Sequence, residues 1–73
     1  MAQSKFVICI ENSDYTASLE KRKIYQVIPD ATAAQIHHIR VVDESGDDYL
    51  YPASCFIDVH LPKAVEAAVV HAA

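Results

Sequence analysis

The stretch DDYLYPASCF, residues 47–56, decides the fold that the sequence predicts. Residues 49–51 read as a short strand, and Pro52 ends it because proline lacks the N–H group that a strand ladder needs. Residues 53–55 are too few for anything longer than a 3-10 turn, and residues 56–60 (FIDVH) return to the alternation of a strand. The sequence therefore predicts one strand, a sharp bend and then the last strand.

Three more strands are predicted before this stretch, because their apolar residues recur at every second position. They cover residues 6–11, 23–28 and 39–42. The acidic turn DESGDD, residues 43–48, contains the only glycine of the chain and predicts a hairpin. We therefore expect an all-β fold, a five-stranded small barrel in which the last strand pairs with the first.

The connecting segments carry turn chemistry. Residues 12–22 are rich in Asn, Ser, Asp and Thr, which favour loops, and we expect one helical turn near residues 18–21. Residues 30–38 (DATAAQIHH) predict a single helical turn that is capped by Asp30 or Thr32.

The chain divides into a barrel, residues 1–61, and a short C-terminal helical tail, residues 62–73. Pro62 suits the first turn of a helix. An apolar stripe at helical spacing follows it: Ala64, Val65, Ala68, Val69 and Ala72.

The predicted core takes inward residues from every strand, and the choice between the two faces of the first strand stays open. It consists of Phe6 or Val7 with Ile8, Ile10, Tyr25, Val27, Ile39, Val41, Tyr51, Phe56 and Val59. Both cysteines are expected to be free, because a reducing cytosol disfavours disulfides. We expect Cys9 in the core and Cys55 partly exposed.

The run YLYPASCF after an acidic hairpin resembles the closing segment of SH3-like barrels. With KFVICIEN, RKIYQVIPD and IRVVDESGDDYLYP in the same order, the resemblance covers residues 5 to about 60. The chain is similar to small uncharacterised bacterial proteins with an SH3-like barrel. The resemblance implies a 3-10 turn before the last strand, but it implies little about function, because one fold hosts many functions.

The resemblance also implies a partner-binding surface. The peptide groove of the family uses a tryptophan, a proline and several tyrosines. This chain has Pro52 and Tyr15 in suitable places but no tryptophan, and Cys55 stands where a groove tyrosine would be. With Tyr51 placed inward, the predicted binding residues are Tyr15, Tyr49, Pro52 and Cys55, and the predicted partner is a protein or peptide.

Composition argues against several other classes of function. The net charge of −4 disfavours nucleic acid, which is bound by clustered Lys and Arg. The apolar run at residues 6–10 is too short to enter a membrane as a span or a signal segment. We expect a cytoplasmic protein, and the alternative to partner binding is a structural role in which the tail stripe holds a weak homo-oligomer.

The sequence contains no motif that is typical of a metal site or a catalytic site. An EF-hand loop that begins at Asp43 would need Gly at position 48 and Glu at position 54, where the chain has Asp48 and Ser54. No pair of cysteines or histidines has zinc-finger spacing, although Cys9, Cys55 and His60 could approach in space. A thiol nucleophile at Cys55 would lack an oxyanion turn. We therefore predict no metal, no cofactor and no enzymatic activity.

Overall fold

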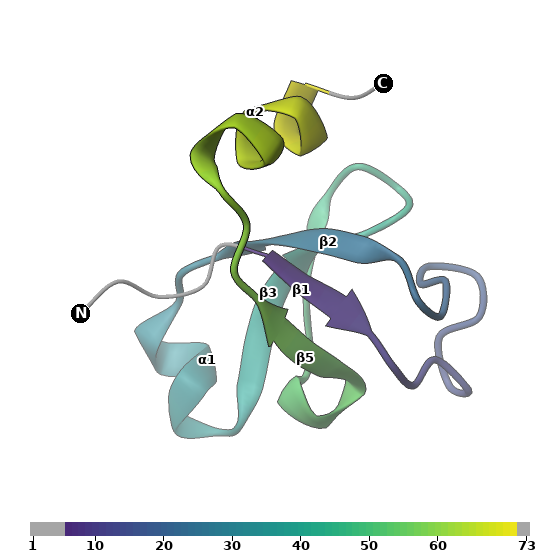
Figure 1. Cartoon of the computed structure of the whole chain (residues 1–73). Coiled ribbons are helices and arrows are strands. Elements are labelled where there is room, and N and C mark those ends of the chain that lie inside the picture. The colour runs from purple at the N-terminus through teal and green to yellow at the C-terminus, as the bar shows by residue number, and fades with distance from the viewer. Residues whose placement is uncertain (1–5, 72–73) are drawn as a thin grey trace.

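The computed structural model of the 73-residue chain describes residues 6–71, with side chains up to residue 69 (Figure 1). All strand pairs are antiparallel, and one sheet has the order β4-β3-β2-β1-β5. The strands are β1 (Phe6–Cys9), β2 (Ile24–Ile28), β3 (His38–Val42), β4 (Asp48–Pro52) and β5 (Phe56–Val59). The helices are α1 (Ala31–Gln35), the 3-10 turn η1 (Ala53–Cys55) and α2 (Lys63–His71). The prediction of an all-β fold with a C-terminal helix is confirmed.

The segment that decides the fold behaves as predicted. Pro52 ends β4 with φ −59° and ψ 132°, and η1 turns the chain directly into β5. β5 then pairs with β1, with Cys9 opposite Phe56. The predicted return of the last strand to the first is therefore confirmed, and η1 links the two strands that lie at opposite ends of the sheet order.

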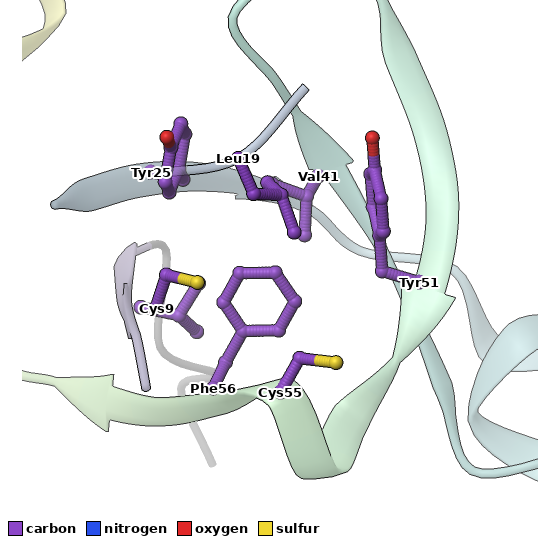
Figure 2. Packing of buried hydrophobic residues seen from close by; sticks show 8 residues of the cluster. Cys9, Leu19, Tyr25, Val41, Tyr51, Cys55 and Phe56 are labelled. Carbon is purple, nitrogen blue, oxygen red and sulfur yellow. The ribbon is translucent and has the colours of Figure 1, made fainter. Parts of the chain in front are cut away.

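The core collects side chains from both ends of the sheet order. Figure 2 shows the Phe56 ring of β5 inside this cluster, with Tyr51 of β4 on one side and Cys9 of β1 on the other. Tyr51 and Phe56 meet edge to face, with ring centroids 6.2 Å apart. The buried members of the cluster are Val7, Cys9, Leu19, Tyr25, Val41, Tyr51, Cys55 and Phe56.

The structure settles which face of β1 is interior and corrects one predicted core residue. Val7 and Cys9 belong to the cluster, whereas Phe6 is buried outside it. Ile10 was predicted to be in the core, but it is 45% exposed. It alternates with Val7 and Cys9, so it falls on the same outer side as Ile8, and it also lies past the end of β1.

Four further predicted core residues are half-buried. Val27 and Ile39 pack against the cluster, whereas Ile8 and Val59 do not belong to it. In an antiparallel pair, residues opposite each other point to the same face of the sheet. Ile8 pairs with Ile57 and Val59 pairs with Phe6, so both lie on the face that turns away from the cluster.

The loop at residues 12–22 is anchored by a residue that was not predicted to be buried. Leu19 is 0% exposed and belongs to the core cluster. Its N–H donates to the Tyr15 carbonyl at 2.9 Å, and its own carbonyl accepts from Asn12 Nδ2 at 2.9 Å. The single helix-like turn of this loop therefore spans residues 15–19 instead of the predicted residues 18–21.

The short helix α1 begins as its sequence predicts. Asp30 is the N-cap, and its carboxylate accepts from the Ala33 N–H at 3.0 Å. The predicted positive φ at the hairpin glycine is also present, because Gly46 has φ +85°. Local turn chemistry is thus sufficient to place both features.

The C-terminal helix α2 presents its apolar residues to solvent. Ala64 and Ala68 are exposed, Val65 is 45% exposed and Val69 is half-buried, while Ala72 lies outside the described residues. Figure 1 shows α2 at the far end of the segment that follows β5. Over residues 6–71 there is no helix that is both long enough and apolar enough to cross a membrane.

Candidate functional site

The strand β4 forms one edge of the sheet, and its backbone has a defined outward side. The Asp43 N–H donates to the Asp47 carbonyl at 3.1 Å, and the Ala53 N–H donates to the His37 carbonyl at 2.9 Å. These two bonds bracket the β3–β4 ladder. Because alternate residue pairs of an antiparallel ladder exchange hydrogen bonds, the backbone N–H and C=O groups of Tyr49 and Tyr51 face β3 and form hydrogen bonds with it.

Asp48 and Leu50 occupy the other positions of the alternation, so their N–H and C=O groups face away from β3. Within the described part of the chain, β4 has only this one partner strand. An edge strand of this kind is a template to which another strand can pair.

The side chains of β4 divide between the two faces of the sheet. Tyr51 points into the core and is 4% exposed, as predicted. Tyr49 lies on the same face but is 53% exposed, and Leu50 on the opposite face is 41% exposed. One strand thus offers an aromatic side chain on one face and an aliphatic side chain on the other.

The face that carries Leu50 continues onto the neighbouring strands. Leu50 pairs with Arg40 of β3, and Arg40 pairs with Ile28 of β2. The Arg40 guanidinium is held by two carboxylates, with Nε 3.0 Å from Asp30 and one terminal nitrogen 2.9 Å from Asp48. These two carboxylates raise the pKa of Arg40, with the Asp48 hydrogen bond as the larger cause.

Tyr15 of the long loop lies beside β4. Its ring meets the Tyr51 ring edge to face, with centroids 5.0 Å apart and an angle of 85° between the planes. Tyr15 is half-buried, and so is Pro52, which follows Tyr51 in the chain. Three of the four predicted binding residues, Tyr15, Tyr49 and Pro52, therefore belong to β4 or contact it. We call Tyr15, Tyr49, Leu50 and Pro52 the β4 surface.

The fourth predicted binding residue, Cys55, is not exposed as expected. It is 6% exposed and packs in the core cluster, where Figure 2 shows its side chain beside Phe56. Its carbonyl accepts from the N–H groups of Ile10 and Glu11 at 2.8 and 3.3 Å. Burial is the main cause that raises the pKa of the Cys55 thiol, with Cys9 as the next. Both cysteines are free.

A buried carboxylate supports the inward side of β4. Asp43 is 7% exposed, and Oδ2 accepts from the Tyr51 hydroxyl at 2.6 Å while Oδ1 accepts from the Ser45 N–H and hydroxyl at 2.9 and 2.5 Å. Burial acts to raise the pKa of Asp43, but these hydrogen bonds lower it overall. The Tyr51 hydroxyl also lies 2.9 Å from Ser18 Oγ, which joins the hairpin to the long loop.

A second set of contacts joins the same two segments. The Tyr25 hydroxyl donates to Glu44 Oε2 at 2.5 Å and accepts from the Glu20 N–H at 2.7 Å. Lys23 Nζ lies 2.6 Å from the same Glu44 oxygen, and the hydrogen bonds from Lys23 and Tyr25 lower the pKa of Glu44. The Glu44 N–H donates to the Ser18 carbonyl at 3.0 Å. The loop therefore forms a fixed support for the β4 surface.

No group of three His, Cys, Asp or Glu side chains within the described residues is arranged to hold a metal ion. The acids of the hairpin are instead used within the fold: Asp43 by hydroxyl groups, Glu44 by Lys23 and Asp48 by Arg40. Asp47 is exposed, and no salt bridge to it is present in the described part of the structure.

Sequence reasoning missed Leu50 as a surface residue and Asp43 as a buried one. Alternation identified the two faces of β4, but it could not show that one end of the sheet order is β4. Comparison with known proteins finds no matching family model, no matching curated protein and no matching solved structure. The function of the chain must therefore be inferred from its own residues.

Proposed function

We propose that the protein is a non-enzymatic binding module, and that it engages a protein or peptide through the β4 surface. The observation that carries the proposal is the exposure of Tyr49 and Leu50, at 53% and 41%, on an edge strand. Exposed aromatic and aliphatic side chains that are held on a rigid support are the usual anchors of protein interfaces. Here the hydrogen bonds of Asp43 and Glu44 provide the support.

The proposal includes an SH3-like barrel and a cytoplasmic location. The pairing of β5 with β1 and the packing of Tyr51 and Phe56 in one cluster support the barrel. The two free cysteines are typical of a reducing compartment and support the location.

The test is partner capture from a cell lysate by full-length protein and by two surface variants, Tyr49→Ser and Leu50→Thr. We expect each variant to reduce recovery of the captured partner several-fold, because hot-spot truncation typically costs about 2 kcal/mol. Ile57→Thr is the matched control, since Ile57 is a 55% exposed residue of the other edge strand, β5. Equal recovery by all three variants and the unmodified protein would contradict the proposed surface.

A second candidate function is assembly through α2, which is favoured by the exposure of Ala64, Val65 and Ala68. In this case a second copy would cover the stripe. Light scattering after size exclusion should give the mass of an oligomer for the full chain and the mass of a monomer for a chain ending at Leu61. A monomer in both cases would remove this candidate.

A further inference from the structure

We propose that the partner binds as an extended segment that adds a strand to the open edge of β4, with the backbone of Asp48 and Leu50 as its anchor. This inference rests on the proposed function and specifies its binding mode. Strand addition gives affinity through main-chain hydrogen bonds and specificity through alternate side chains.

The backbone of β4 limits how long the added strand can be. The outward groups are the N–H and C=O of Asp48 and of Leu50, together with the C=O of Pro52, which has no N–H to offer. Ala53 cannot extend this row, because its N–H already donates to the His37 carbonyl. The edge thus accepts a short strand that is centred on Leu50.

The two faces of β4 select the side chains of that strand. A residue of the added strand opposite Leu50 would lie on the same face as Leu50 and contact it, next to the cross-strand row that continues to Ile28. Its two neighbours in sequence would point to the other face, beside Tyr49 and Tyr51. The partner segment should therefore carry β-branched side chains on both faces, with apolar ones on the face of Leu50.

Charge selects a basic partner. Asp47 and Asp48 begin the edge, and Arg40 pairs with Asp48 but not with Asp47. The chain has a net charge of −4. A Lys or Arg at the end of the segment that lies beside the hairpin would meet this unbalanced negative charge.

A second copy of the chain fits the edge less well than a basic segment does. In an antiparallel pair centred on Leu50, each Asp48 lies opposite the Pro52 of the other copy. The Asp48 carbonyl would then face a residue without an N–H, and two hydrogen bonds of the ladder would be lost. A partner segment without proline opposite Asp48 loses only one of them, the bond that Pro52 of β4 itself cannot donate.

The experiment uses the full-length, isotope-labelled protein and a synthetic peptide of alternating valine and threonine that ends in lysine. NMR follows the amide exchange of Leu50 and Asp48 as peptide is added. A matched peptide carries N-methyl groups on two consecutive central residues, which removes one donor from each of its two edges and keeps every side chain. A third peptide replaces lysine by glutamate.

We expect the lysine peptide to slow the exchange of the Leu50 amide, and the N-methylated peptide to bind at least about tenfold more weakly, which corresponds to one or two lost hydrogen bonds. The glutamate peptide should also bind more weakly. Leu50→Pro, which removes the outward donor, should abolish binding, whereas Leu50→Thr, which keeps that donor and loses only the apolar side-chain contact, should weaken binding several-fold without abolishing it.

Three results would overturn the inference: no binding of the lysine peptide, equal binding of the N-methylated peptide, or unchanged exchange of the Leu50 amide at saturation. Protection of Leu50 that grows with protein concentration and needs no peptide would instead assign the edge to a second copy. If partner capture from a lysate still depends on Tyr49 while strand addition fails, the binding module stands and only its binding mode is wrong.

Discussion

The Tyr51 hydroxyl donates a hydrogen bond of 2.6 Å to Asp43 Oδ2, across the hairpin that joins β3 to β4. Both residues are buried, at 4% and 7% exposed. A carboxylate in such a place is stable only if its oxygens accept hydrogen bonds, and Ser45 supplies the others. This contact connects the core to the edge strand that carries the proposed binding residues.

Replacing the Tyr51 hydroxyl should lower the free energy of unfolding. Tyr51→Phe keeps the ring but leaves Asp43 with one donor fewer, and we expect a loss of about 1–3 kcal/mol in urea unfolding. Tyr49→Phe is the matched control on the same strand, and because Tyr49 is 53% exposed it should change stability by less than about 0.5 kcal/mol. Similar losses in both variants would show that the Asp43 contact contributes nothing.

The stability of the protein should fall in acid. Hydrogen bonds hold the folded-state pKa of Asp43 below its ordinary value of 3.8, and that of Glu44 below 4.5. The unfolded state therefore binds protons first, so this stabilisation is complete above the ordinary values and is lost as the pH falls through the lower folded values. Urea unfolding at a series of pH values should show this decline, and Asp43→Asn should reduce its slope. An unchanged slope would contradict the role of Asp43.

Truncation of Leu19 should be far more harmful than truncation of the predicted core residue Ile10. Leu19→Ala leaves a cavity in the core cluster and should cost about 2–5 kcal/mol. Ile10→Ala removes a side chain that is 45% exposed and should cost less than about 1 kcal/mol. Thermal and urea unfolding of both variants compare them directly, and the reverse order would refute this assignment of the core.

The thiol of Cys55 should react slowly in the folded protein. Burial raises its pKa, so both access and the thiolate fraction are low. In Cys9→Ala, where Cys55 is the only thiol, labelling at pH 8 should be at least about tenfold slower than in denaturant. Tyr49→Cys, made in a chain that also carries Cys9→Ala and Cys55→Ala, places a thiol on the exposed face of β4 and should react rapidly. Fast labelling of Cys55 would show that η1 opens readily.

The sequence by itself determined the local features of the fold. Strand alternation, the break at Pro52, the Asp30 cap and the positive φ of Gly46 depend on residues within a few positions of each other. The return of β5 to β1 was also predictable, because a proline and a three-residue turn leave the chain few directions in which to continue.

Only the tertiary structure decided which of these residues are buried and which strands form the edges of the sheet. Leu19 sits in a polar loop, and Asp43 in an acidic turn, yet both are buried because the loop folds back onto the hairpin. Cys55 is interior for the same kind of reason, since it packs in a cluster with residues of β1, β2, β3 and the long loop. Burial depends on contacts between segments that are distant in sequence. The composition of a short stretch does not determine which of these segments will pack against it.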